Sequence, residues 1–196
     1  MAVFASRQIV LPKMVNYVNF IQSSGTQYIK TGIYPTQNHR VECDIELTSF
    51  GLSVLFGHYL SGSNQFAAIC LNGGATWRAW FGSAATDFSG DCTGRHQITF
   101  SKTAMTTSSG SVSYSGTAFT SSIEMYIFGL SSGSSATFEY PASMKLYNFK
   151  IYECDTLLRD FWPCYDPDGV ACLYDKVEKK YYYNAGTGEF IAGEAA

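Results

Sequence analysis

The sequence predicts an all-β fold, built as a sandwich or a barrel. Short runs that alternate apolar and polar residues recur about every eight to twelve residues, as strands do. Stretches rich in Gly and Ser separate these runs and are typical of turns. No stretch of about a dozen residues shows helical periodicity, so we expect at most a helical turn near residues 118–122 or 155–160. With 196 residues, 46% of them hydrophobic, the chain can bury one sizeable core.

The chain is expected to begin with an N-terminal arm, residues 1–14, followed by one β domain over residues 15–196. The arm is short, and its larger apolar residues are Phe4, Ile9, Val10 and Leu11. It is interpreted either as an edge strand or loose terminus, or as an anchor that packs on a neighbouring subunit, because an ordered apolar arm needs a surface to pack on. The arm lacks the long apolar run of a signal peptide or membrane span, so we expect synthesis in the cytoplasm and no membrane insertion.

The clearest strand of the first half lies at residues 40–48, where odd-numbered residues are apolar and even-numbered residues are polar. One face of this strand should pack and the other should meet water. On another expected strand, residues 76–81, Trp77 and Trp80 fall on opposite faces. Further strands are expected at residues 15–21, 28–33, 54–57, 65–71, 96–100 and 123–130. The turns and loops between them are expected at residues 61–64, 72–74, 87–94, 108–116 and 131–135.

The last fifty residues are dense in aromatic side chains and are expected to close the core. Residues 145–154 alternate, which predicts a strand with even-numbered residues on one face and odd-numbered residues on the other. The run from Asp166 to Gly169 reads Asp-Pro-Asp-Gly and predicts a tight turn. A strand at residues 170–174 and a Gly-rich turn at residues 184–188 follow.

Both ends of the chain carry a resemblance to a known family. The upstream part reads FIQSSGTQYI at residues 20–29 and TGIYP at residues 31–35. The downstream part reads LLRDFWPC at residues 157–164 and DPDGVACLYD at residues 166–175. Over residues 17–193 the chain resembles a concanavalin A-like, laminin-G-like sandwich module of phage and prophage virion proteins. The resemblance implies an antiparallel two-sheet β-sandwich of jelly-roll type.

The resemblance also implies a function and a location. We expect a non-enzymatic protein on the surface of a phage particle, either a head decoration or fibre subunit or a tail-associated adhesion module. Such a protein would contact capsid or tail subunits through its arm, assemble as a homo-oligomer in the particle, and hold host or mucosal carbohydrate. Two alternatives stay open, a β-glucanase-like glycoside hydrolase and a free bacterial carbohydrate-binding module.

Charge and cysteine content narrow the classes of partner. Only 15% of the residues are charged and the net charge is −3, which gives no basic footprint for nucleic acid or an anionic membrane. None of the six cysteines has zinc-site spacing. Cys43, Cys70 and Cys154 are expected to be small buried residues. Cys164 and Cys172 flank one hairpin, and whether they form a disulfide is left open.

Glu42, Asp44 and Glu46 are the candidate catalytic residues of the glucanase alternative. On a strand these three carboxylates share a face. Two of them would serve as nucleophile and general acid, with Asp44 tuning their pKa values. The competing interpretation is a solvated outer face, favoured because the motif falls on about the third strand, whereas in such glucanases it comes much later in the chain, and because a shared fold does not carry an active site with it.

Aromatic and amide side chains near predicted turns are the candidates for carbohydrate binding. Sugars stack on exposed rings, and amide, hydroxyl and carboxylate groups bond their hydroxyls. The competing interpretation is that most of these rings are core. The candidate residues are Tyr59, Trp80, Trp162, Asn64, Asn72 and Asp87.

Metal sites and histidine chemistry have weak support in the sequence. Laminin-G-like domains sometimes bind calcium through loop carboxylates, for which Asp87, Asp91 and Asp166 are the candidates here, but nothing in the sequence groups them. No cofactor is otherwise expected. His39, His58 and His96 each lack a partner at ligand spacing and are interpreted as structural.

Overall fold

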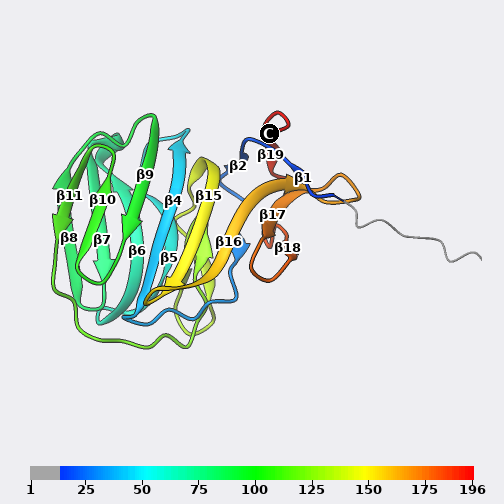
Figure 1. Cartoon of the computed structure of the whole chain (residues 1–196). Helices are drawn as coiled ribbons and strands as arrows, with labels where there is room; N and C mark the ends of the chain where they lie inside the picture. The colour runs from blue at the N-terminus through cyan, green and yellow to red at the C-terminus, as the bar shows by residue number, and fades with distance from the viewer. Residues whose placement is uncertain (1–13) are drawn as a thin grey trace, which may run out of the picture.

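The computed structural model describes residues 14–196, so the predicted arm lies outside the described residues apart from Met14. The described chain forms two β-sheets, which confirms the antiparallel two-sheet sandwich (Figure 1). The strands of the described chain pair antiparallel, except for β5 and β13, which are parallel. Within the described residues the only helical element is a single 3-10 turn, η1 (Asn72–Gly74).

The first sheet has the strand order β11-β10-β9-β4-β15-β16-β17-β18, with β1 paired to β16, β2 to β15, and β19 to β2. Its strands are β1 (Asn16–Tyr17), β2 (Ile21–Ser24), β4 (His39–Leu47), β9 (Arg95–Phe100), β10 (Ala104–Thr107), β11 (Gly110–Ser113), β15 (Ser143–Glu153), β16 (Thr156–Tyr165), β17 (Ala171–Asp175), β18 (Lys180–Tyr182) and β19 (Ile191–Ala192).

The second sheet has the order β14-β13-β5-β6-β7-β8, and β12 joins β3 to β5. Its strands are β3 (Ile29–Lys30), β5 (Ser53–Ser61), β6 (Asn64–Leu71), β7 (Thr76–Phe81), β8 (Ala84–Ser89), β12 (Tyr126–Ile127), β13 (Leu130–Ser132) and β14 (Thr137–Glu139).

Aromatic rings fill the space between the sheets. Phe56 of the second sheet meets Phe149 of the first edge-to-face, with ring centroids 5.1 Å apart. Phe66 meets Phe100 in the same manner at 4.7 Å. Each fully buried ring of this kind stabilises the fold by roughly 1.5–3 kcal/mol. Trp77 is also fully buried, and its indole Nε1 donates to Ser109 Oγ at 3.0 Å, which satisfies its only polar atom.

Two strands agree closely with the sequence analysis. β4 buries its apolar odd-numbered residues, and the carboxylates between them lie on the other face, where Glu42 and Glu46 are partly exposed and Asp44 is buried. β7 spans the expected residues, with Trp77 buried and Trp80 half-buried on the opposite face. The alternation of these two strands therefore predicts their faces correctly.

The predicted faces of residues 145–154 are wrong for the first part of β15. Leu146 pairs with Ile45 and Asn148 pairs with Asp44, so Tyr147 is an extra residue in a β-bulge. The bulge shifts the alternation by one position. Leu146 is therefore buried in the core, and Tyr147 and Asn148 are both partly exposed.

Other expected elements also differ. The expected strand at residues 123–130 is broken into β12 and β13 by Phe128, whose φ of 73° is incompatible with an extended strand. Phe128 packs its ring against Phe190 in the core, with centroids 5.0 Å apart. Residues 87–89, expected in a loop, and residues 156–160, expected in a helical turn, belong to strands β8 and β16. Residues 118–122 contain no helical turn either.

The cysteines follow the expectation with one exception. Cys43 and Cys70 are buried, whereas Cys154 is exposed, because it occupies the turn between β15 and β16 with φ 52°. Cys164 and Cys172 lie opposite each other on β16 and β17, with their Sγ atoms 3.6 Å apart and both thiols free.

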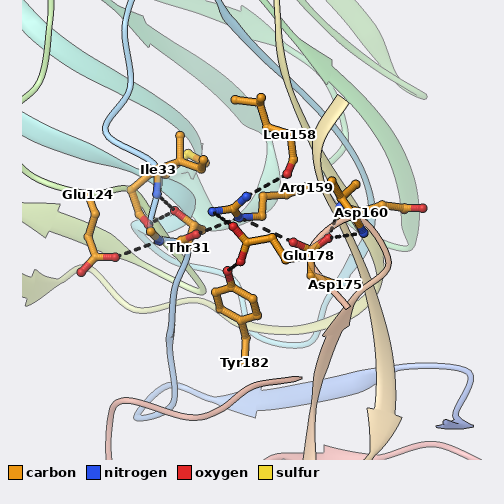
Figure 2. A network of polar contacts seen from close by, with 12 residues as sticks. Thr31, Ile33, Glu124, Leu158, Arg159, Asp160, Asp175, Glu178 and Tyr182 are labelled. Carbon is orange, nitrogen blue, oxygen red and sulfur yellow. Dashed lines mark hydrogen bonds and ion pairs between the residues drawn. The ribbon is translucent and has the colours of Figure 1, made fainter. Parts of the chain in front are cut away.

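A polar network centred on Arg159 joins β16 to its neighbours (Figure 2). The guanidinium Nε donates to the carbonyl of Thr31 at 3.3 Å and lies 3.6 Å from Asp175 Oδ2. A terminal nitrogen contacts Glu178 Oε1 at 2.8 Å, and Tyr182 donates to the other oxygen of Glu178 at 2.6 Å. The side chain of Asp175 is fully buried. This network fastens the C-terminal strands, which Figure 1 shows beyond the body of the sandwich, to the segment after β3.

Candidate functional site

Tyr59 and Trp80 come together on the outer face of the second sheet. Tyr59 lies on β5 and Trp80 on β7, and the rings lean toward each other across β6 with centroids 5.5 Å apart. On β6 between them, the small Ala67 lies opposite Trp80 and Gln65 lies opposite Tyr59. Tyr59 and Trp80 are both partly exposed. Two of the aromatic residues predicted from the sequence therefore form one half-buried pair.

A groove lies beside this pair, and the register of five strands sets the residues along it. Successive pairings connect Glu139, Leu130, Gly57, Ala67 and Trp80 in one row across β14, β13, β5, β6 and β7. The row crosses four strand spacings, so its two ends are about 19 Å apart. The side chains of the row share the outer face of the sheet, because residues opposite each other in a ladder point the same way.

The centre of this row consists of apolar residues, two of which are small. Leu130 and Ala67 are buried. Gly57 has no side chain, and a Cβ there would lie 2.4 Å from the Cβ of Ala67, so the close approach of β5 and β6 requires glycine. This face has a hollow of about 590 Å³, whose lining includes Tyr59, Trp80, Leu130 and Ala85.

Polar groups line the rim of the hollow. They include the hydroxyls of Ser83 and Ser132, the amide of Gln65 and the carboxylate of Glu139. Gln65 donates to the carbonyl of Ala84 at 3.2 Å, which fixes its orientation. The groove thus combines a ring pair with hydrogen-bonding groups, a combination suited to ligands that have both an apolar and a hydroxylated face.

Asp87 lies at the same face but is engaged with a neighbour. It is opposite Arg78 in the ladder, and the guanidinium donates to both carboxylate oxygens, one of them at 2.8 Å. These hydrogen bonds hold the pKa of Asp87 below its usual range. Arg78 lines the groove, so Asp87 acts on it through Arg78.

The other residues predicted to bind carbohydrate do not contribute to this groove, or their side chains are not among those that the structure describes. Asn64 is engaged internally, with His58 Nε2 2.9 Å from its Oδ1 and its Nδ2 donating to the Thr120 carbonyl at 2.9 Å. The side chain of Asn72 lies outside the described residues. Trp162 lies on β16 in the first sheet, apart from the groove.

Trp162 borders a second hollow of about 590 Å³ on the first sheet, together with Phe20, Tyr147 and Arg95. Cations cover its rings: Lys176 Nζ lies 3.6 Å from the Trp162 ring centroid, and the Arg95 guanidinium lies 3.6 Å from that of Tyr147. Such stacking is worth about 0.5–1 kcal/mol at exposed sites, which a stacking ligand would have to displace. No cation–ring contact involves Tyr59 or Trp80 within the described residues. The groove on the second sheet is therefore the better candidate.

The three carboxylates of the glucanase alternative share the outer face of β4, and each has a partner. Arg40 and the Tyr152 hydroxyl contact Glu42. Asp44 accepts two hydrogen bonds from Arg95, at 2.8 and 2.9 Å.

Glu46 accepts from the Tyr147 hydroxyl at 2.7 Å and from Lys145 at 3.1 Å. These hydrogen bonds hold the pKa of Glu46 below its usual range. A carboxyl group that serves as a general acid needs the opposite shift.

Calcium candidates and histidines are dispersed. Asp91 accepts from the Thr93 amide, and Asp166 accepts from the amides that follow it in its turn and from Tyr183. Between residues 14 and 196, no three His, Cys, Asp or Glu side chains are grouped to hold a metal ion. The described chain also contains no helix long and apolar enough to cross a membrane.

Sequence reasoning missed Glu139, Arg78, Gln65 and Ser132. None of them belongs to a local motif, and each reaches the groove only through its position in the ladder. The signal that could have identified Arg78 is its spacing of two residues from Trp80 on the same strand face. No protein-family model and no curated protein matches the sequence.

Proposed function

We propose that this protein is a non-enzymatic carbohydrate-binding domain that holds glycans in the groove on the outer face of the second sheet. One observation supports the proposal most directly: Tyr59 and Trp80 form an uncapped pair beside a hollow with a polar rim. A sugar ring has C–H groups on one face and hydroxyls at its edge. The aromatic rings can stack on the C–H face, and the polar groups of the rim can form hydrogen bonds with the hydroxyls.

Hydrolysis is the less favoured function, because the free aromatic rings and the three carboxylates of β4 lie on different sheets. Among residues 14–196, Glu139 is the only carboxylate that lines the groove with the free aromatic rings, and a glycosidase of the usual type uses a pair. The carboxylates on β4 lie in the other sheet, where Tyr147 and Lys145 depress the pKa of Glu46. A reducing-sugar assay on mixed-linkage β-glucan is expected to stay at background, and turnover that Glu42→Gln abolishes would refute the non-enzymatic proposal.

We place the domain on a phage particle because of the sequence resemblance at residues 17–193. In this proposal residues 1–14 attach the domain to a capsid or tail subunit and the groove faces outward. Deleting residues 1–14 is expected to prevent incorporation into particles while leaving glycan binding unchanged. A truncated protein that still enters particles would refute the anchoring role.

The binding proposal is tested with a glycan array, followed by titration calorimetry on the best ligand. Trp80→Ala and Tyr59→Ala are each expected to weaken binding at least tenfold, or about 1.4 kcal/mol. Trp80→Phe keeps an aromatic face and should retain part of the affinity. Tyr34→Ala removes an exposed tyrosine outside the groove and is the matched control, expected to bind like the unchanged protein. No ligand on the array, or equal affinity in all four variants, would refute the proposal.

A further inference from the structure

The groove carries an unbalanced negative charge. Arg78 and Asp87 neutralise each other through two hydrogen bonds. Glu139 is exposed, and no described residue forms an ion pair or hydrogen bond with its carboxylate. Among the described residues, the charged side chains that line the hollow are Arg78 and Glu139. Because Asp87 balances Arg78 from beside the hollow, the three side chains together have a net charge of about −1 at neutral pH.

Glu139 occupies a defined position relative to the aromatic pair. It lies two strands from β5, which carries Tyr59, and four strands from β7, which carries Trp80. At a strand spacing of about 4.8 Å, Glu139 is roughly 19 Å from Trp80 along the row. Tyr59 lies on β5 two residues beyond Gly57, beside the row, and pairs with Ser132 of β13. In the row, Leu130 and Gly57 come next after Glu139, and Leu130 also lines the hollow. A sugar stacked on the rings would therefore extend toward Glu139 through its neighbouring unit.

A carboxylate is an acceptor without a donor of its own at neutral pH. Toward a neutral sugar, Glu139 accepts hydrogen bonds from hydroxyls, which always have a proton to donate. Toward a uronic or sialic acid it presents a like charge, and two such charges in partly exposed surroundings repel. The same side chain thus favours one class of glycan and disfavours the other.

We propose that the groove is selective for neutral oligosaccharides and that Glu139 is the residue that excludes acidic ones. This inference rests on the proposed carbohydrate-binding function. The aromatic pair provides affinity for any sugar ring, and Glu139 provides the discrimination by charge at the neighbouring unit.

The test compares neutral oligosaccharides with uronic acid-containing oligosaccharides of equal length, by titration calorimetry at low salt. The unchanged protein is expected to prefer the neutral ligand. Glu139→Gln keeps the size and an acceptor oxygen, so it should raise affinity for the acidic ligand about five- to tenfold and change affinity for the neutral ligand less. Glu189→Gln removes the same charge outside the groove and should change neither. Raising the salt concentration should narrow the preference of the unchanged protein, because ions screen exposed charges.

The outcomes separate the two proposals. The role of Glu139 would be overturned if the unchanged protein bound neutral and acidic ligands with equal affinity, or if Glu139→Gln did not raise the affinity for the acidic ligand. Either result would leave the carbohydrate-binding function standing. Failure to bind either ligand class, together with an empty glycan array, would overturn the function itself.

Discussion

Replacing Arg159 by methionine should destabilise the fold strongly, because the change leaves a buried carboxylate without its cation. The side chain of Asp175 is 0% exposed and its Oδ2 lies 3.6 Å from Arg159 Nε. Removing one partner of a buried ion pair costs about 3–5 kcal/mol. Asp175 keeps two amide donors on Oδ1, from Asp160 at 2.9 Å and Val177 at 3.0 Å, so the lower end of this range, about 3 kcal/mol, is expected. Met is chosen because it fills most of the space of the Arg stem.

The assay is urea unfolding followed by tryptophan fluorescence. Lys145→Met is the control, because Lys145 and Glu46 form a partly exposed pair worth about 0–1 kcal/mol. The double variant Arg159→Met/Asp175→Asn should be more stable than Arg159→Met alone, since it has no buried charge left to compensate. A loss below about 1 kcal/mol in Arg159→Met, or a double variant as unstable as the sum of its two single changes, would refute the reasoning.

Two further predictions concern His58 and Cys154. Burial lowers the pKa of His58 to about 4, below the unfolded value of about 6.5. The unfolded chain therefore binds more protons, so this contribution to stability is complete above pH 6.5 and falls by up to about 3 kcal/mol toward pH 4. His58→Gln should flatten that part of a pH series of urea unfolding, and an unchanged slope would contradict the assignment. A thiol reagent should modify Cys154 fast and the five buried cysteines slowly; a fast phase that survives Cys154→Ser would show that another thiol is accessible.

The sequence was sufficient for strands that contain no bulge, as β4 and β7 show. β4 and β7 each bury one set of alternate residues, because side chains on a strand point to opposite faces and only the apolar set gains by leaving water. The same reasoning set Trp80 apart from the buried Trp77 and so identified half of the aromatic pair. The turn from Asp166 to Gly169 was equally readable, and Gly169 has the positive φ of 85° that such a turn favours.

Alternation gave the wrong face where a bulge intervenes. A strand can insert one residue only against a partner strand, as β15 does at Tyr147 opposite β4, and neither strand shows this in its own sequence. Phe128 breaks a run of apolar residues for a related reason. Its left-handed conformation is set by packing in the core against Phe190, which lies 62 residues further along the chain.

The sequence by itself determined that this protein is an all-β sandwich and that Tyr59 and Trp80 are candidates for binding. Only the tertiary structure decided which candidates meet. Trp162 and Tyr59 both lie near predicted turns, yet they belong to different sheets, and Glu139 joins Trp80 through five strands in register. Strand order and register depend on contacts between segments far apart in the chain, so a site built across a sheet has no local signature.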